Sequence, residues 1–326
     1  MIARSLVLFG MAVALASAGA RVAAAETWPS HPLTMLVPFP AGGPTDALAR
    51  IMAERLTRAL GQSVVVDNVS GAGGTVGTAK VGRAPADGYT LCIGQLTSHV
   101  FSPAVYATPY DVQADFQPIG VISISALMLI GRADLPATLP ELIAWLKTTP
   151  QPATVGTIGV GSPAHVWTVE FAKLTGARFQ LVPYRGAAPV MQDMLAGRVD
   201  LAALEASSSL PYVQGGKVRG FAILSPQRWK VAPGIPTLAE LGFPGYEMPF
   251  WSGLWVRKGT PPDIVAKLDA ALLESLADPA VVKRLTDLGQ EIPARAEQTP
   301  EGLAARHRGD IEKWWPLIKA ANLKAE

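Results

Sequence analysis

Short apolar or β-branched runs alternate with helical patterns along the chain, and this alternation constrains the fold more than any other feature. The runs cover residues 33–37, 64–67, 90–94, 153–158, 179–183 and 218–224. Between the first two runs, apolar residues recur at helical spacing from position 48 to position 60, and Gly61 follows as the expected stop. The pattern predicts an α/β fold with mainly parallel strands.

Two longer runs with few polar residues, at 119–130 and 250–256, interrupt this alternation. They are too apolar to be linkers, and they stand where a second set of strands and helices begins and ends. We interpret them as strands that cross between two domains. Residues 26–130 and 249–326 would then form domain 1, and residues 131–248 domain 2.

The first 25 residues have the pattern of a secretory signal peptide. Arg4 precedes an uncharged apolar run at 6–20, and three alanines at 23–25 provide small residues for cleavage. The run is shorter than the roughly 20 residues that a membrane-spanning helix needs. We therefore expect a mature start near Glu26 and a periplasmic protein.

The charge balance and the single cysteine narrow the classes of partner. Without Arg4 and Arg21, the remaining 26 basic residues equal the 26 acidic ones, so the expected mature chain has no net formal charge. A neutral chain has no general attraction for nucleic acid, and we expect none as a partner. Cys92 has no second cysteine to pair with and lies in the apolar stretch YTLCIG, which favours a buried side chain. We expect a monomer without a metal ion or cofactor.

Two glycine-rich turns, each between a predicted strand and a predicted helix, have matching chemistry. In the first, Gly42 and Gly43 precede Thr45 and Asp46, either of which can cap the helix. In the second, Gly159 and Gly161 precede Ser162, an expected N-cap followed by proline. Each turn is expected to present unpaired main-chain N–H groups and the positive end of a helix dipole.

Neither turn contains lysine or arginine, so an anion there would be held by main-chain dipoles and hydroxyl groups. Either turn alone is better interpreted as an ordinary connection, but one in each predicted domain favours an anion-binding cleft. A third glycine-rich stretch, at 70–78, is a weak match to dinucleotide-binding turns. We favour a tight turn into a helix beside the cleft.

Taken together, the chain resembles the extracytoplasmic receptors of tripartite tricarboxylate transporters, the Bug family. The resemblance covers nearly all residues after position 25 and depends on the order of many motifs. The main ones are VPFPAGGPTDALAR, NVSGAGGTVGTAKV, ADGYTLCIG, GVGSPAHVWTVEF, VPYRGAAPVMQDMLAGRVDL and WVRKGTPP.

The resemblance implies a two-domain periplasmic-binding-protein fold of the Venus-flytrap, type II-like class, with crossing strands. It also implies that a small organic carboxylate is captured between the two turns and delivered to the integral-membrane subunits of such a transporter. The site residues that it implies are Phe39, Gly42, Gly43, Thr45 and Asp46 on one side, Thr157, Ile158, Gly161, Ser162 and His165 on the other, and Ser98 and His99 facing the cleft.

One departure from the family pattern concerns the far end of the ligand. Leu204 and Glu205 follow the stretch GRVDLAA, where the family often has an Asp-Asn pair. Glu205 could accept a hydrogen bond from an ammonium or hydroxyl group of the ligand, or it could be a solvated helix cap. Dicarboxylates, tricarboxylates, aromatic carboxylates and amino acids all remain possible ligands.

Two other functions use the same residues. Ser162 and His165 could belong to an exported hydrolase, but the chain has no known nucleophile motif, and an N-cap serine normally bonds the backbone. We therefore do not expect an enzyme. A periplasmic sensor that presents its closed form to a signalling partner would close in the same way, and the sequence does not separate it from a transport receptor.

Overall fold

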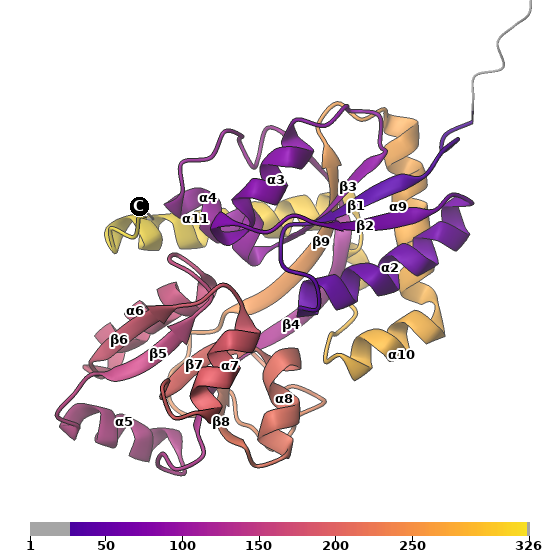
Figure 1. The fold of residues 1–326 in the computed structure, drawn as a ribbon. Helices are drawn as coiled ribbons and strands as arrows, with labels where there is room; N and C mark the ends of the chain where they lie inside the picture. Colours follow the sequence, from indigo (N-terminus) through magenta and orange to yellow (C-terminus); the bar gives the residue numbers. More distant parts are fainter. Residues whose placement is uncertain (1–26, 325–326) are drawn as a thin grey trace, which may run out of the picture.

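The computed structural model describes residues 27–324, so the expected signal peptide and its cleavage site lie outside the described residues. Within this range the strands form a continuous sheet of nine strands in the order β2-β1-β3-β9-β4-β7-β5-β6, with β8 also paired to β4 (Figure 1). The strands are β1 (Leu33–Val37), β2 (Val64–Asn68), β3 (Thr90–Gln95), β4 (Phe116–Arg132), β5 (Ala153–Thr157), β6 (Phe179–Pro183), β7 (Leu201–Glu205), β8 (Val218–Ile223) and β9 (Pro249–Arg257).

The long strand β4 runs through both halves of the molecule. It pairs antiparallel with β9 as far as Ala126, opposite Pro249, and from Leu127 onward it pairs with β7 and β8. We call the part built on β1, β2, β3, β9 and the first part of β4 lobe 1, and the part built on β5 to β8 and the rest of β4 lobe 2. The crossing strand expected at 119–130 is confirmed, whereas the run at 250–256 forms β9, which pairs only with strands of lobe 1 and begins where the chain returns from lobe 2.

Helices cover both faces of the sheet in each lobe (Figure 1). In lobe 1, β1 contributes side chains to the apolar cores on both faces of the sheet, because successive side chains of a strand point to opposite faces. Met35 belongs to an apolar cluster with residues of the helices α2 (Pro44–Leu60), α9 (Pro262–Ala277) and α10 (Pro279–Asp287). Leu36 belongs to a second cluster with residues of α3 (Thr75–Gly82), α4 (Ser102–Val105) and α11 (Pro300–Ala320). The helical segments are α2 (Pro44–Leu60), η1 (Ala72–Gly74), α3 (Thr75–Gly82), η2 (Thr97–Phe101), α4 (Ser102–Val105), α5 (Leu139–Thr148), α6 (Pro163–Thr175), α7 (Ala187–Leu195), α8 (Ala206–Gln214), α9 (Pro262–Ala277), α10 (Pro279–Asp287), η3 (Arg295–Glu297) and α11 (Pro300–Ala320).

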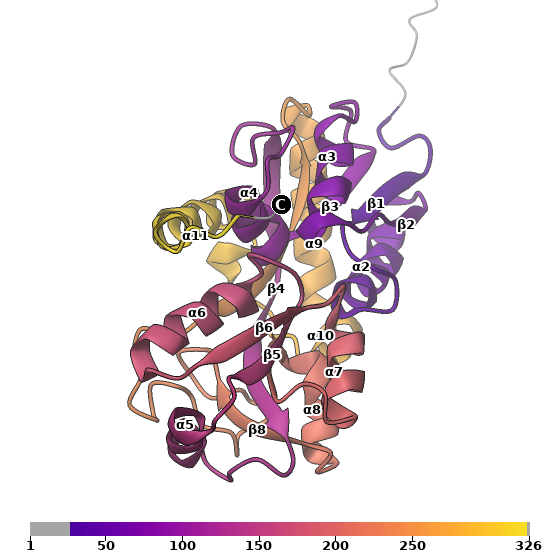
Figure 2. The ribbon, with the colours of Figure 1, turned by 60° about the vertical axis from the view of Figure 1, so that its left-hand side comes forward.

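One apolar cluster passes from lobe 1 into lobe 2. Phe101 and Trp314 of lobe 1 belong to the same cluster as Trp167 and Phe171 of α6. Figure 2 shows α6 next to α4 and α11, on the side where the lobes meet. The two lobes are therefore in contact in this arrangement.

All six short runs predicted from the sequence form strands, with small differences at their ends. The strand that the sequence pattern missed is β7, whose residues are LAALE. Alanine, leucine and glutamate are strong helix formers, so propensity argues against a strand there. Pairing with β4 on one side and β5 on the other overrides that preference.

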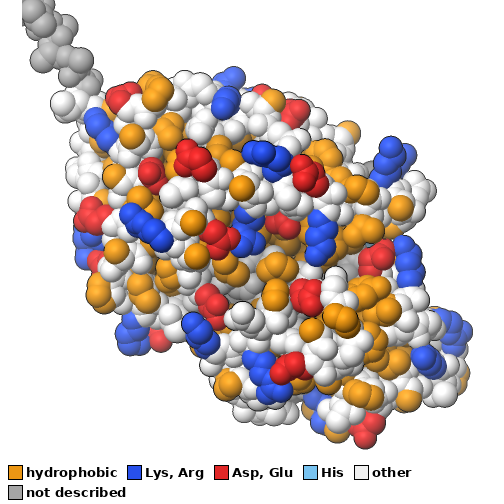
Figure 3. Space-filling view, turned by 180° about the vertical axis from the view of Figure 1, so that it is seen from behind, with side chains coloured by type: hydrophobic (Ala, Val, Ile, Leu, Met, Phe, Trp, Pro, Cys, Tyr) orange, Lys and Arg blue, Asp and Glu red, His pale blue; other side chains and the backbone are white. Residues whose placement is uncertain are grey.

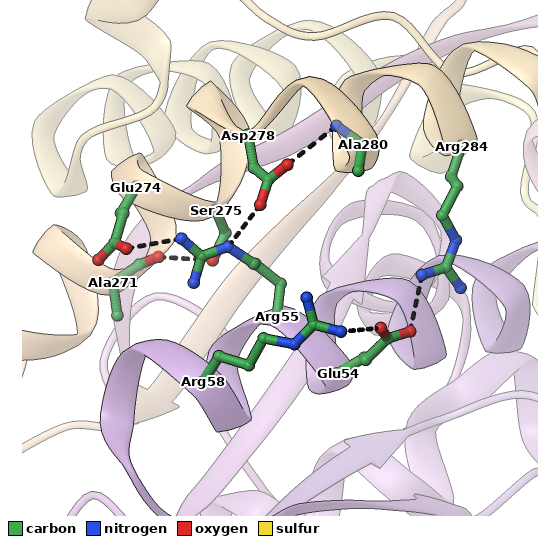
Figure 4. A network of polar contacts seen from close by, with 9 residues as sticks. All are labelled: Glu54, Arg55, Arg58, Ala271, Glu274, Ser275, Asp278, Ala280 and Arg284. Carbon is green, nitrogen blue, oxygen red and sulfur yellow. Dashed lines mark hydrogen bonds and ion pairs between the residues drawn. The ribbon is translucent and has the colours of Figure 1, made fainter.

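A network of ion pairs fixes α2 against α9 and α10 (Figure 4). The guanidinium of Arg55 donates to Glu274 at 2.6 Å and to Asp278 at 2.9 Å. Glu54 accepts from Arg284 of α10 and from Arg58 of its own helix, each at 2.7 Å. The network therefore fixes the C-terminal half of α2, the helix that begins directly after the first glycine-rich turn.

We expect Arg55→Ala to destabilise the protein by about 1 kcal/mol or more, because it removes two charge-assisted bonds from a guanidinium that is only 15% exposed. Arg58→Ala is the matched control, since Arg58 is 67% exposed and pairs within its own helix. Urea unfolding of both variants measures the difference. Equal losses would contradict the clamping role of Arg55.

Candidate functional site

The first turn, between β1 and α2, is held by side chains from within and beside it. Gly43 is the N-cap of α2 and has no side-chain cap, so neither Thr45 nor Asp46 occupies that position as the sequence suggested. The Asp46 carboxylate instead reaches back and accepts the N–H of Gly42 at 2.9 Å. The N–H of Gly42 is therefore not free, contrary to the expectation from sequence.

Two polar contacts complete the first turn. Asp46 also accepts from Arg50 at 3.0 Å, and the Thr45 hydroxyl donates to Gln95 at 3.2 Å. Burial opposes ionisation of Asp46, but its hydrogen bonds from Arg50 and Gly42 outweigh that effect and leave its pKa below the usual value. Asp46 is thus an ionised, buried carboxylate that orders the turn.

The second turn, between β5 and α6, has the predicted cap. The Ser162 hydroxyl accepts the N–H of His165 at 3.3 Å, and Pro163 occupies the first helical position. The N–H of Gly161 donates to Nδ1 of His165 at 3.0 Å. In both turns, therefore, the side chain four residues after a glycine accepts the glycine N–H.

The bond from Gly161 defines the chemical state of His165. An Nδ1 atom that accepts a hydrogen bond carries no proton, so the ring proton of the neutral imidazole is on Nε2. Burial lowers the pKa of His165, which favours this neutral form. His165 is only 9% exposed. It can donate one hydrogen bond through Nε2 without carrying a charge.

The third glycine-rich stretch turns through η1 into α3, and it lies beside the first turn. A side chain at Gly74 would touch Phe39 of the first turn and Ser98 of η2. Gly161 of the second turn lies against Val105 of α4, and its φ of +70° adds to the constraint on any replacement. The two turns are thus linked by a continuous line of contacts along η2 and α4.

The expectation that Ser98 and His99 face the cleft is wrong for His99. Both side chains have 0% exposure, but Ser98 still touches the glycine-rich stretch. The His99 ring stacks on Trp255, with 4.8 Å between ring centroids, and the main-chain oxygen of His99 accepts from His307 at 2.8 Å. Stacking in the core of lobe 1 leaves His99 no surface for a ligand.

Glu205 is not a solvated cap, although it occupies the N-cap position of α8. Its Oε1 accepts from the hydroxyl of Ser125 at 3.1 Å and from the amide of Gln290 at 2.6 Å. Burial raises the pKa of Glu205, and these hydrogen bonds act in the opposite direction. The carboxyl group is anchored at the junction of the lobes.

The carboxyl ends of β5 and β7 lie at the same edge of lobe 2 because these neighbouring strands are parallel. This edge brings Glu205 into the neighbourhood of Thr157 and Ile158, which lead into the second turn. Thr157 is 1% exposed, and its main-chain oxygen accepts from Tyr184 at 2.8 Å. Thr157 therefore shapes the edge mainly through its backbone.

Several residues that order the site were not predicted from the sequence. Asn68 donates to the main-chain oxygen of Phe39 at 3.2 Å. Its place at the end of the strand beside β1 is a signal that could have identified it. Gln95, Ser125 and Gln290 gave no such signal, because their partners are distant in sequence.

Within residues 27–324, no group of three or more histidine, cysteine, aspartate or glutamate side chains is arranged to hold a metal ion. Among the same residues, no helix has the length and apolarity that a bilayer span requires. Burial raises the pKa of Cys92 to about 12, so its thiol is not a reactive thiolate at neutral pH.

The face seen in Figure 3 carries lysine and arginine interspersed with aspartate and glutamate. Charges of one sign do not gather into a broad patch there. A phosphate backbone needs an extended basic surface, and this face does not provide one.

Two lobes joined by crossing strands, with a strand–helix turn from each lobe on a shared surface, define a solute-binding protein of the periplasmic-binding-protein class. A family model described as "Tripartite tricarboxylate transporter family receptor" matches residues 48–323. The chain belongs to this family of receptors.

Solved structures agree with this assignment. The periplasmic binding protein BugD is 35% identical, with a TM-score of 0.84 over 92% of this chain and 100% of BugD. MatC from Rhodopseudomonas palustris, solved with malate, is 32% identical, with a TM-score of 0.83 over 89% of this chain and 100% of MatC. An R. palustris protein solved with adipate is 34% identical, with a TM-score of 0.85 over 91% and 99%. The expected two-domain receptor fold and the family resemblance are confirmed.

We expect His99 to make the protein less stable as the pH falls. Burial, together with repulsion from His307, lowers its pKa well below 6.5. Below about pH 6.5 the unfolded chain therefore binds a proton that the folded chain does not, which costs up to about 1.4 kcal/mol per pH unit. His99→Leu should remove this part of the slope.

Urea unfolding between pH 7.5 and 5.5 measures the effect as the difference between wild type and His99→Leu. Comparing variants is necessary because burial raises the pKa of Glu205 and Asp310, which changes stability in the opposite direction. His31→Gln, at an exposed position, is the control for removal of a histidine. Parallel slopes for His99→Leu and wild type would contradict the prediction.

Proposed function

We propose that this protein is exported to the periplasm, captures a small organic carboxylate between the two glycine-rich turns, and delivers it to the integral-membrane subunits of a tripartite tricarboxylate transporter. It acts as a monomer and without catalysis. The observation that carries the proposal is the pair of turns, one on each lobe, linked by contacts along η2 and α4. The proposed ligand site comprises Phe39, Gly42, Gly43, Thr45, Asp46, Ser98, Thr157, Ile158, Gly161, Ser162, His165 and Glu205.

The donors proposed for the carboxylate are those that the turns leave unused. The first N–H groups of an α-helix have no acceptor within the helix, which applies to the starts of α2 and α6. The glycine N–H groups of Gly42 and Gly161 already bind Asp46 and His165. The main-chain N–H groups of Gly43 and Thr45, and Nε2 of His165, are the proposed contacts.

The charges of the two turns favour a particular placement of the ligand. Asp46 holds a negative charge beside the first turn, and His165 is neutral beside the second. A carboxylate is repelled less on the His165 side. We therefore place the ligand carboxylate nearer to the second turn, with the first turn closing over it.

The structures solved with malate and adipate support a small organic carboxylate as the ligand of this chain. Glu205 distinguishes among such ligands, because a second carboxylate near it would be repelled. A ligand whose far end carries a hydroxyl or ammonium group could instead donate to Glu205. We place such hydroxy or amino acids ahead of simple dicarboxylates, tricarboxylates and aromatic acids.

The hydrogen bonds of the second turn argue against the hydrolase alternative. The Ser162 hydroxyl accepts a main-chain N–H, and Nδ1 of His165 accepts another. A serine nucleophile needs a direct bond to a basic ring nitrogen, and this arrangement uses both groups elsewhere. A sensor that feeds a signalling partner uses the same closure, and recovery of membrane partners from cells distinguishes it from a transport receptor.

Gly43→Ala should weaken binding at least tenfold while changing stability by no more than about 1 kcal/mol. The φ of Gly43 is −83°, and an added Cβ would make ordinary contact at 3.4 Å with the oxygen of Pro40, so the fold tolerates alanine. The methyl group would stand where a carboxylate oxygen approaches the turn. A thermal-shift screen of organic acids, followed by calorimetry on those that bind, measures the loss.

The control for this test is Gly234→Ala, at an exposed position with open space around it. It should bind with wild-type affinity. Wild-type affinity in Gly43→Ala would remove the first turn from the site, and a wild-type protein that binds no acid would refute the proposed function.

Glu205→Gln should change which acids bind best, because it removes the negative charge near the far end of the ligand. Ligands with a second carboxylate should gain affinity relative to those with a hydroxyl or ammonium group. The same screen, run on wild type and variant, gives the two rankings. An identical order would show that Glu205 does not contact the ligand.

A further inference from the structure

The hinge between the lobes can be located from strand pairing. Ile124 of β4 pairs with Glu291 through two main-chain bonds of 2.9 and 2.7 Å, so the segment around Glu291 moves with lobe 1. Leu127, three positions later, pairs with Glu205 of lobe 2. Any rotation of one lobe against the other must therefore be absorbed by β4 at Ser125 and Ala126, and by the adjoining end of β9.

One side-chain bond bridges this short hinge. Gln290, next to Glu291, donates its amide N–H to Glu205 at 2.6 Å. Gln290 is 4% exposed, and its own main-chain N–H donates to the oxygen of Leu285 at 2.8 Å. Its backbone is thus fixed to lobe 1, and its side chain holds the end of β7 in lobe 2.

We infer that Gln290 is a positioning residue that acts through Glu205, and that their hydrogen bond holds the two lobes in the arrangement in which both turns face one ligand. Rotation about the hinge carries Glu205 away from Gln290. Beyond about 3.5 Å the bond is lost, and a half-buried carboxyl group is left with fewer donors. Ser125, which lies within the hinge and also donates to Glu205, reinforces the same arrangement.

The inference rests on the proposed function only where it concerns affinity, because the lobe arrangement can be measured without a ligand. Gln290→Leu removes the donor and keeps the side chain close in size. We expect a larger radius of gyration in small-angle X-ray scattering of the unliganded protein, and faster deuterium exchange at residues 123–128. We also expect about tenfold weaker binding of every acid that binds, with their order unchanged.

The matched control is Gln298→Leu. Gln298 is also buried, at 7% exposure, and its amide donates at 2.8 Å to the oxygen of Pro293 within lobe 1. This variant should lose some stability but keep the wild-type radius. If Gln298→Leu expands the protein as much as Gln290→Leu does, the effect is loss of a buried amide and the inference is overturned.

Exchange of the two side chains tests the bond itself. In the double variant Gln290→Glu with Glu205→Gln, an amide again faces a carboxylate, so the radius and the exchange rates should return toward wild type. Glu205→Gln alone keeps an oxygen that can accept from Gln290, so it should not expand the protein. Failure of the double variant to recover, or a wild-type radius in Gln290→Leu, would overturn the inference. Absence of any bound acid would instead refute the proposed function.

Discussion

The antiparallel pairing of β4 with β9 is the constraint on which the rest of the structure depends. The pair runs from Phe116 to Ala126 on β4, and beyond it β4 continues into the sheet of lobe 2. A single strand therefore belongs to the hydrogen-bonded ladder of both lobes. Such a connection permits bending at a few residues while it prevents the lobes from sliding, because sliding would break the register of every pair.

The shared strand β4 limits how the two lobes, and therefore the two turns, can move relative to each other. Each turn is ordered by a hydrogen bond from its own helix, through Asp46 in one case and His165 in the other. The turns therefore lose little conformational freedom on binding, which favours affinity. What remains to be fixed on binding is the angle between the lobes, and that angle is set at the hinge.

Most strands were predictable because their signals are local. A short apolar run between turns indicates a strand without information about residues distant in sequence. β7 was not, because LAALE becomes a strand only through its neighbours β4 and β5. The same distinction applies to the site. The cap at Ser162 is a local feature and was predicted, whereas the burial of His99 depends on His307, which is 208 positions away along the chain. Likewise, the role of Glu205 depends on Gln290, 85 positions away.

In the proposed function, the placement of Glu205 beside the hinge links ligand recognition to closure of the lobes. The carboxyl group lies at the strand edge that leads into the second turn, and it is bonded to a residue of lobe 1. A ligand that contacts this edge changes the environment of the bond between Gln290 and Glu205, which restrains rotation of one lobe against the other. Ligands bind preferentially to the arrangement in which they contact both lobes, and they can shift the population only by that difference in affinity. The bond between Gln290 and Glu205 already favours the arrangement of the lobes that binds the ligand, so less of the binding free energy is spent on reaching it. The hinge bond and the turns therefore act on the same equilibrium between lobe arrangements.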